Sequence, residues 1–275
     1  MFVSPMLLER IEEPFNSDDY ITELKLDGIR LLLSKFDNKI RLHTRHNNEV
    51  TALFKEIYQN IDIPNGTVLD GELIVPGADG SPNFEYVMER FKSPRSDHFL
   101  QYCVFDIIYF NGNKVDKLPL LKRKELLMGL EMDCNRVVPI QWIEGNGVHY
   151  FNAVKERDLE GIVLKRKDSI YEINKRSDKW LKVINYKYQD VLITGMLKKE
   201  RSFLLSSLDK SHHIGVMEFI PNQERKFIYS EIINKGTIET NEIVRFKEGI
   251  RCNVKFRNWT SKGKLRIPSF YKWIS

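Results

Sequence analysis

Cysteines are scarce in this sequence and long apolar runs are absent, and both features limit the kind of protein that it can encode. Only three cysteines occur among 275 residues, and they lie far apart, at Cys103, Cys134 and Cys252. They can form neither a disulfide framework nor a four-cysteine zinc site, so we expect a reducing, cytoplasmic setting. No apolar run is long enough to cross a membrane, and the first ten residues lack the basic start and apolar core of a signal peptide. We therefore expect no membrane partner.

Repeats and low-complexity segments are also missing, and the composition is that of a folded protein. Apolar residues make up 42% and charged residues 29% of the chain, and its length allows one large domain or two modest ones. Up to about residue 185, short β-prone runs alternate with helical patterns, which predicts an antiparallel α+β domain. The expected strands are 20–26, 29–36, 39–44, 66–75, 100–110, 161–165 and 180–184, and the expected helices are 51–59 (capped by Thr51), 83–92, 120–130 and 148–157.

A different pattern follows residue 185 and predicts a second domain. Five or six short strands with one helix in under a hundred residues are typical of a small β-barrel such as the OB-fold, a common platform for nucleic acids. We place the first domain at residues 1–187 and the OB-fold domain at residues 188–275. The strand-like runs are 190–197, 202–208, 215–219, 242–246, 251–257 and 264–270, and the helical run is 223–234.

Positive charge is concentrated in the second domain. The chain has 27 basic and 29 acidic residues up to Gln189, but 16 basic and 9 acidic residues from Asp190 onward. Between Arg245 and Ser275, only Glu248 opposes nine basic residues, and aromatic residues alternate with them. This pattern favours a polyanionic partner such as nucleic acid, and the alternative is an ordinary solvated basic surface.

The candidate chemistry begins at Lys25. Alternate side chains of a strand point the same way, so Glu23, Lys25 and Asp27 would share one face at the edge of a turn made by Gly28. Such a group can be an ion-paired surface strand, which is the ordinary interpretation of an isolated K-x-D-G sequence. The functional interpretation is a lysine nucleophile between two carboxylates.

A nucleophilic Lys25 has to lose a proton. A lysine with its free pKa of about 10.4 is protonated and inert at neutral pH, and the flanking acids alone would favour the charged form. We therefore expect a positive group close to Lys25, for which a divalent ion, Arg30 and Arg45 are the candidates.

The run 25–30 (KLDGIR) resembles motif I, KxDGxR, of the covalent nucleotidyltransferases, which comprise DNA ligases, RNA ligases and mRNA capping enzymes. Further motifs of that superfamily follow in order over essentially the whole chain, and the ordered set is far more specific than any single motif. The matching runs are 44–45 (TR), 70–73 (DGEL), 102–106 (YCVFD), 160–165 (EGIVLK) and 180–182 (WLK).

The resemblance implies that Lys25 attacks the α-phosphate of ATP, forms a lysyl-adenylate and expels pyrophosphate. Such catalysis depends on positioning and on cations directed at the charge that develops on the phosphoryl oxygens. Lys165 and Lys182 are suited to the α-phosphate. Glu72 and Glu160 are suited to bind Mg²⁺ or Mn²⁺, and the alternative for both is a surface or ion-paired glutamate.

The resemblance also implies roles around the nucleoside. Glu23 would accept a hydrogen bond from the adenine amino group and set base choice, and Phe105 would present its ring to the adenine face. The alternative for Phe105 is a plain core phenylalanine. Arg30 and Arg45 would contact the ribose and later the 5′-phosphate of a nick, for which a guanidinium is well suited.

One position departs from the family pattern. Many ligases carry the motif LKxK, and here Ile184 stands in place of its second lysine. Of the two lysines of this motif, only Lys182 is present here. Either Lys179 or Lys187 supplies the second phosphate contact, or that contact is absent.

The end of the chain narrows the resemblance. The runs 254–260 and 263–270 resemble the end of the OB domain in small bacterial and phage ATP-dependent DNA ligases. Arg266 would then orient the pyrophosphate leaving group when that domain closes over ATP. The alternative for Arg266 is a contact with DNA phosphate from a basic strand.

Three alternatives account for less of the sequence. An NAD-dependent ligase carries an additional nicotinamide-binding domain, for which the 24 residues before Lys25 are too few, and a four-cysteine zinc site. An RNA ligase or mRNA-capping-type nucleotidyltransferase shares motif I, but 180–182 and 263–270 resemble DNA ligases. A non-enzymatic OB-fold nucleic-acid-binding protein leaves the ordered motifs unexplained.

The sequence as a whole predicts a monomeric ATP-dependent DNA ligase of the bacterial or phage type, active in DNA repair, replication or recombination. AMP would pass from Lys25 to the 5′-phosphate of a nick in double-stranded DNA, and the 3′-hydroxyl would then displace it. The domains would move between steps about a hinge near 186–190, and the basic residues after Arg245 would bind DNA phosphates.

Overall fold

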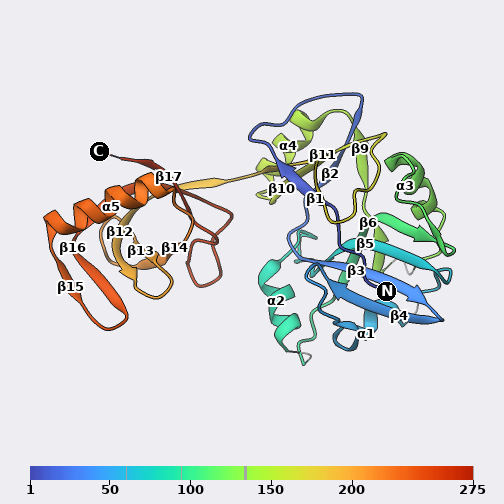
Figure 1. Ribbon diagram of the computed structural model, residues 1–275, viewed down its shortest axis with the longest axis horizontal. Helices are drawn as coiled ribbons and strands as arrows, with labels where there is room; N and C mark the ends of the chain where they lie inside the picture. The colour runs from blue at the N-terminus through green and yellow to red at the C-terminus, as the bar shows by residue number, and fades with distance from the viewer. Residues whose placement is uncertain (60, 94, 133–134, 275) are drawn as a thin grey trace. The chain divides into compact units, whose positions relative to one another are not determined.

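The computed structural model describes residues 1–59, 61–93, 95–132 and 135–274, and the chain divides into two compact units. Unit 1 is Met1–Asn185 and unit 2 is Tyr186–Ser275 (Figure 1). Both combine helices with sheets in which most strand pairs are antiparallel, which confirms the predicted α+β class. No helix within these ranges is long and apolar enough to cross a membrane.

The first sheet of unit 1 contains six strands. Their order is β4-β3-β5-β6-β7, and β8 pairs with β6 in parallel. Both faces of β3 are buried, because Leu31 and Leu33 pack into one core cluster and Leu32 into another. The strands are β3 (Ile29–Phe36), β4 (Lys39–Thr44), β5 (Thr67–Ile74), β6 (Gln101–Phe110), β7 (Asn113–Lys114) and β8 (Val137–Pro139).

The second sheet of unit 1 has five strands and packs on the first. Its order is β1-β11-β10-β2-β9, in which only the β1–β11 pair is parallel. One core cluster joins the sheets, with Ile21 and Trp180 from the second and Leu32, Val68 and Ile108 from the first. Each such buried side chain contributes about 1.5–3 kcal/mol, so this cluster fixes the two sheets face to face. The strands are β1 (Leu7–Arg10), β2 (Tyr20–Leu24), β9 (Trp142–Glu144), β10 (Gly161–Arg166) and β11 (Arg176–Ile184).

Short helices cover parts of both sheets (Figure 1). The Asn83 side chain caps α2 by accepting a hydrogen bond from the backbone N–H three residues on, at 3.2 Å. Phe151 and Val154 of α4 pack against Ile162 and Leu164 of β10. The helices of unit 1 are η1 (Thr51–Leu53), α1 (Lys55–Tyr58), α2 (Phe84–Lys92), α3 (Leu120–Met128) and α4 (Gly147–Glu156).

Unit 2 is built on a six-stranded antiparallel sheet. The order is β14-β13-β12-β16-β15, and β17 also pairs with β16. The ladder of described strands ends at β14 and β15, so it does not form a closed barrel. Ile228 of α5 packs into the core of the sheet. The elements are β12 (Lys187–Leu197), β13 (Ser202–Ser206), β14 (His213–Met217), α5 (Asn222–Lys235), β15 (Thr237–Glu239), β16 (Ile243–Phe256) and β17 (Ser269–Trp273).

The predicted helix 51–59 is wrong as a single element. It is broken between η1 and α1 at Phe54, whose side chain is fully buried, so core packing overrides the local helical pattern. Thr51 does not cap it either, because the Thr51 hydroxyl accepts a hydrogen bond from the Leu42 N–H at 2.9 Å.

Two strand predictions in unit 2 are also wrong. The runs 242–246 and 251–257 are one continuous strand, β16, and no turn separates them. The strand expected at 264–270 begins only at Ser269, because Ile267 has a positive φ of 53° and Pro268 lacks an N–H to donate to a ladder.

The two described cysteines are buried thiols. Cys103 and Cys252 are free, and burial raises the pKa of each to about 12. Both are therefore protonated and unreactive at neutral pH. Cys134 lies outside the described residues.

Candidate active site

A cavity in unit 1, whose empty space of about 450 Å³ includes its mouth toward solvent, brings together most of the residues that the sequence singled out. Both sheets supply its walls. The lining side chains include Glu23, Lys25, Arg30, Glu72, Phe105, Lys165 and Trp180.

A wider cleft of about 1020 Å³ shares Lys25, Arg30 and Glu72 with this cavity. Its remaining polar lining is mainly cationic, and Glu72 is its only carboxylate among the described residues. A cleft of this charge favours a polyanion such as a chain of phosphates. The further polar residues are Thr44, Arg45, His46, Arg176 and Lys182.

Lys25 lies where the cavity meets the cleft, directly after β2 ends at Leu24. Its backbone N–H donates to Gly161 O at 2.9 Å, which holds it beside the start of β10. Its Nζ lies 2.7 Å from Glu160 Oε2, and the side chains of Lys25 and Glu160 are 19% and 9% exposed. The amine is thus accessible from the cavity but held by one carboxylate.

The prediction that Glu23, Lys25 and Asp27 share one face of a strand is wrong. The strand ends before Lys25, so the alternation of a strand does not extend through Asp27. Glu23 points into the interior, where its carboxylate pairs with two other lysines, and Glu160 is the acid that pairs with Lys25.

Glu72, on β5, is the second carboxylate near the Lys25 amine. Burial raises the pKa of Glu72 to about 8, and the neighbouring Glu160 raises it further, while Lys25 and Arg30 oppose the shift. A positive charge placed near this carboxyl would favour its ionised form. In the described residues, no group of three or more His, Cys, Asp or Glu side chains is arranged to hold a metal ion. Two carboxylates do suit Mg²⁺, which is often bound by one or two of them together with substrate phosphates.

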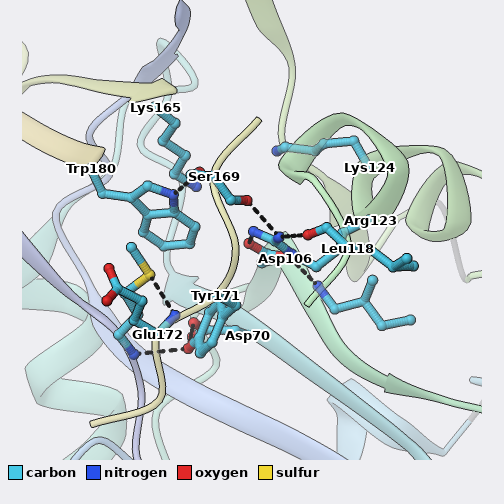
Figure 2. Close-up of polar contacts among 12 residues, drawn as sticks. Asp70, Asp106, Leu118, Arg123, Lys124, Lys165, Ser169, Tyr171, Glu172 and Trp180 are labelled. Atoms are coloured by element: carbon cyan, nitrogen blue, oxygen red, sulfur yellow. Dashed lines mark hydrogen bonds and ion pairs between the residues drawn. The ribbon is translucent and has the colours of Figure 1, made fainter. Parts of the chain in front are cut away.

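Arg30, on β3, is fixed by a buried carboxylate. Its Nε and Nη2 donate to the two oxygens of Asp70 at 2.9 and 2.5 Å, and Asp70 is fully buried on β5. The Tyr171 hydroxyl donates to Asp70 at 2.6 Å, and both residues are drawn in Figure 2. The same hydroxyl accepts from the Met6 N–H at 3.1 Å. The bidentate pair with Asp70 raises the pKa of Arg30, so its charge is permanent, and its guanidinium lies 5.2 Å from the Phe105 ring centroid.

Lys165, on β10, is almost fully buried among aromatic rings. Its Nζ lies 2.7 Å from Glu23 Oε2, 4.1 Å from the Trp180 ring centroid and 4.5 Å from the Phe105 ring centroid. Burial lowers the pKa of Lys165 to about 8, although the nearby Glu23 opposes the shift. Phe105 is half-buried and forms part of the cavity wall, so it is not a plain core residue.

A second buried ion pair stabilises the wall that carries Trp180. Arg123 of α3 donates to both oxygens of Asp106 at 2.7 and 2.9 Å, and both side chains are fully buried. Arg123 also donates to the Ser169 carbonyl at 2.9 Å, and the Ser169 hydroxyl accepts from the Trp180 ring N–H at 3.3 Å. Figure 2 shows this chain of contacts running from α3 to Trp180.

The other predicted phosphate contacts lie at the cleft. Lys182 on β11 and the exposed Arg45 after β4 both line it. Ile184, at the place of the missing lysine, is buried and pairs with Gly161. The lining residues include neither Lys179 nor Lys187, but they do include Arg176, an exposed cation at the start of β11.

Arg266 belongs to unit 2, in the segment between β16 and β17. Its backbone N–H donates to Asn258 O at 3.0 Å, and its carbonyl accepts from the Arg257 N–H at 3.0 Å. The leaving-group role of Arg266 therefore stays a prediction that depends on how the two units meet during the reaction.

Sequence reasoning missed two side chains of this site. Arg176 lies outside the recognised motifs and resembles any basic surface residue. Lys124 of α3 is buried against Glu23, but it stands in a run of alternating leucines and charges that predicts only an amphipathic helix. Trp180 was part of a recognised motif, and only its position in the cavity wall is new.

Comparison with known proteins places these features in one family. The family model described as "ATP dependent DNA ligase domain" matches residues 5–183. The SPbeta prophage-derived DNA ligase-like protein LigB of Bacillus subtilis is 57% identical over 273 residues, which cover 99% of each chain. The multifunctional non-homologous end joining protein LigD of Mycobacterium bovis is 29% identical over 90% of this chain, which spans only 35% of that protein.

A solved structure supports the same fold. A Lig E DNA ligase superimposes with a TM-score of 0.69 over 98% of both chains, at 19% sequence identity. At that identity the likeness concerns the fold alone.

Proposed function

The chain belongs to the ATP-dependent DNA ligase family, and from this premise we propose that it seals nicks in double-stranded DNA through an adenylate carried on Lys25. The observation that supports this most directly is the place of the Lys25 amine, where a cavity with aromatic walls meets a cationic cleft. The cavity would hold the adenine nucleoside, and the cleft would hold the phosphates.

The first step joins AMP to Lys25. The Lys25 nitrogen attacks the α-phosphorus of ATP, a P–N bond forms, and the bond to the bridging oxygen breaks, so that pyrophosphate leaves. The amine must lose a proton for this attack, and Glu160 Oε2, at 2.7 Å, is placed to accept it. Arg30, Lys182 and Arg176 would stabilise the charge on the phosphoryl oxygens from the cleft.

The nucleoside would be recognised by the walls of the cavity. Phe105 offers ring surface, and the buried Trp180 ring supports it edge-to-face, with the two centroids 6.4 Å apart. The Glu23 carboxylate is fixed in the wall by lysines, so that it could accept from the adenine amino group.

Glu72 and Glu160 would hold a divalent cation, Mg²⁺ or Mn²⁺. Two carboxylates leave room in the coordination sphere for phosphate oxygens and water, and a cation here would oppose the effects of burial and of the Glu160 charge, which raise the pKa of Glu72. When bound, the ion supplies positive charge at the α-phosphate and helps to orient pyrophosphate.

The two later steps would take place on DNA. AMP passes from Lys25 to the 5′-phosphate at the nick, and the 3′-hydroxyl then attacks that phosphate and displaces AMP. Arg45 is exposed at the cleft and suited to the 5′-phosphate. All proposed catalytic side chains except Arg266 come from unit 1, and no second copy of the chain is needed in this proposal.

We also propose that residues 1–187 form the adenylation domain and residues 188–275 an OB-fold domain that binds DNA. An OB-fold is a partly open barrel. Two hydrogen bonds bring the segment after β16 to the β14 side of the sheet: Leu265 N–H to Ile214 O at 2.7 Å, and Phe270 N–H to Phe219 O at 2.9 Å.

One surface of unit 2 combines aromatic and basic side chains. Tyr188 and Tyr271 are about half exposed, and their ring centroids lie 4.7 Å apart. Lys255 Nζ lies 5.3 Å from the Tyr186 ring centroid, and Lys272 is exposed beside Tyr271. Such a surface suits the sugar-phosphate backbone of DNA, so binding should weaken steeply as salt increases.

The test is adenylation and nick sealing by the whole protein. Purified wild type and Lys25→Ala are freed of bound AMP, incubated with radiolabelled ATP and Mg²⁺, and separated on a denaturing gel. We expect a covalent label on the wild type alone, released when nicked DNA is added and sealed. An unlabelled wild type would contradict the proposal, and a label from GTP in place of ATP would assign the chain to capping-type chemistry.

A further inference from the structure

Lys124, which lies outside all the recognised motifs, contacts Glu23 in the cavity wall. The Lys124 side chain is 1% exposed, and its Nζ forms an ion pair with Glu23 Oε1. Figure 2 shows Lys124 leaving α3 on the side that faces Lys165 and Trp180. The amine also lies 4.8 Å from the ring centroid of Trp142, on β9. Lysines are almost never fully buried unless they are paired, so this contact is a specific feature of the fold.

Glu23 is therefore held from two sides. Lys124 reaches Oε1 from α3, while Lys165 reaches Oε2 from β10 at 2.7 Å, and Glu23 itself is 2% exposed. Two cations on separate elements fix both the position and the plane of the carboxylate. Each carboxylate oxygen can accept more than one hydrogen bond, so Glu23 keeps acceptor capacity for a ligand in the cavity that it lines.

A fixed carboxylate in this place can discriminate between purines. The amino group of adenine donates hydrogen bonds, whereas guanine has a carbonyl oxygen at the same ring position. A carboxylate that cannot turn away attracts the first group and repels the second. If Glu23 were held by one lysine only, it could rotate and relieve the repulsion.

We propose that Lys124 is a positioning residue for nucleotide selection, which holds Glu23 in the orientation that favours adenine. The inference rests on the proposed function, because it concerns the base of the nucleotide that Lys25 attacks. Lys124 contacts Glu23 and not the substrate, so its effect is indirect.

The alternative is that Lys124 only attaches α3 to the sheet. That helix already has other anchors, because Arg123 forms a buried bidentate pair with Asp106, and Leu120 and Leu127 are fully buried in core clusters. A purely structural role would slow the reaction of every nucleotide by the same factor. A positioning role changes the ratio between nucleotides.

The test compares ATP with purine riboside triphosphate, which lacks the amino group, and with GTP. The rate of covalent labelling at low nucleotide concentration is measured for the wild type, Lys124→Met, Lys124→Arg and Glu23→Gln. Lys122→Met is the matched control, because Lys122 lies on the same helix with a 62% exposed side chain paired to Glu125.

We expect the wild type to prefer ATP to purine riboside triphosphate by about tenfold or more, as for a hydrogen bond to a charged group. This preference should fall severalfold in Lys124→Met, to near the value of Glu23→Gln, and persist in Lys124→Arg and Lys122→Met. The rate of labelling by GTP, relative to that by ATP, should rise in Lys124→Met and in Glu23→Gln.

An unchanged preference in a folded Lys124→Met protein would overturn the inference, and so would an unchanged preference in Glu23→Gln. If Lys124→Met does not fold, the Glu23→Gln/Lys124→Met double variant replaces both members of that ion pair with neutral side chains, and its preference should equal that of Glu23→Gln alone. A preference in the double variant that falls well below that of Glu23→Gln would also overturn the inference. Absence of label from any nucleotide in the wild type would instead contradict the proposed function.

Discussion

Tyr171→Phe tests the buried network that fixes Arg30 at the cavity. The change removes one oxygen and leaves the Arg30–Asp70 ion pair in place. That oxygen donates to the Asp70 carboxylate at 2.6 Å and accepts from the buried Met6 N–H at 3.1 Å. The variant therefore isolates the contribution of the hydroxyl to the free energy of unfolding.

The expected loss can be worked out from these two contacts. A hydrogen bond to a charged group contributes about 1.5–3 kcal/mol and one between neutral groups about 1 kcal/mol. The free energy of unfolding of unit 1 should therefore fall by about 3 kcal/mol, which is roughly a hundredfold in the folding equilibrium constant. A less constrained Arg30 should also raise the ATP concentration needed for half-maximal labelling.

Hydrogen exchange in urea, followed peptide by peptide, measures unit 1 and unit 2 separately. Tyr102→Phe is the matched control, because Tyr102 is equally buried and its hydroxyl donates to neutral groups, the carbonyls of Leu31 and Leu69, at 3.0 and 3.2 Å. We expect this control to cost about 1 kcal/mol. The reasoning is refuted if Tyr171→Phe costs no more than the control, or if unit 2 loses protection and unit 1 does not.

Three further predictions concern pH, the metal ion and DNA. Burial lowers the pKa of Lys165 to about 8, so between pH 8 and about 10.5 the unfolded chain binds a proton at this lysine that the folded protein does not. The free energy of unfolding of the wild type, relative to that of Lys165→Met, should therefore rise with pH over that range. A difference between the two proteins that does not change with pH would contradict this prediction. Removal of divalent ions with EDTA should abolish labelling of Lys25. Glu72→Gln should raise, at least several-fold, the Mg²⁺ concentration that restores labelling. If the wild type and the variant need the same Mg²⁺ concentration, Glu72 is not a ligand. Replacement of Lys255 and Lys272 by glutamine should lower the slope of log affinity for nicked DNA against log salt by up to about two, and an unchanged slope would place the DNA elsewhere.

The hairpin of β3 and β4, which a local turn determines, was predicted with correct bounds. Strands 29–36 and 39–44 are confirmed as β3 and β4, because the turn between them, Asp37 and Asn38, has two positive φ angles of 50° and 55°. Asn and Asp favour that conformation, and the hairpin register follows from it. The short strands β1, β8 and β9 were missed, because three or four residues carry no periodicity and pair only with distant segments.

The same distinction applies to the site. The motifs predicted which side chains are near the cavity, because most of the motifs include the local sequence that forms the strand on which they lie. They did not predict the partners, since Lys25 pairs with Glu160 across 135 residues and Glu23 with Lys124 across 101. Lys122 and Lys124 stand two residues apart on α3, and only the tertiary fold makes one largely exposed and the other buried.

The central claim is that Lys25 carries AMP, and intact-protein mass spectrometry followed by peptide mapping tests it most directly. After incubation with ATP and Mg²⁺, we expect a mass increase of one adenylyl group per chain, located on the peptide that contains Lys25 and lost when nicked DNA is added. Adenylation of another residue, or none on a protein freed of AMP beforehand, would contradict the account.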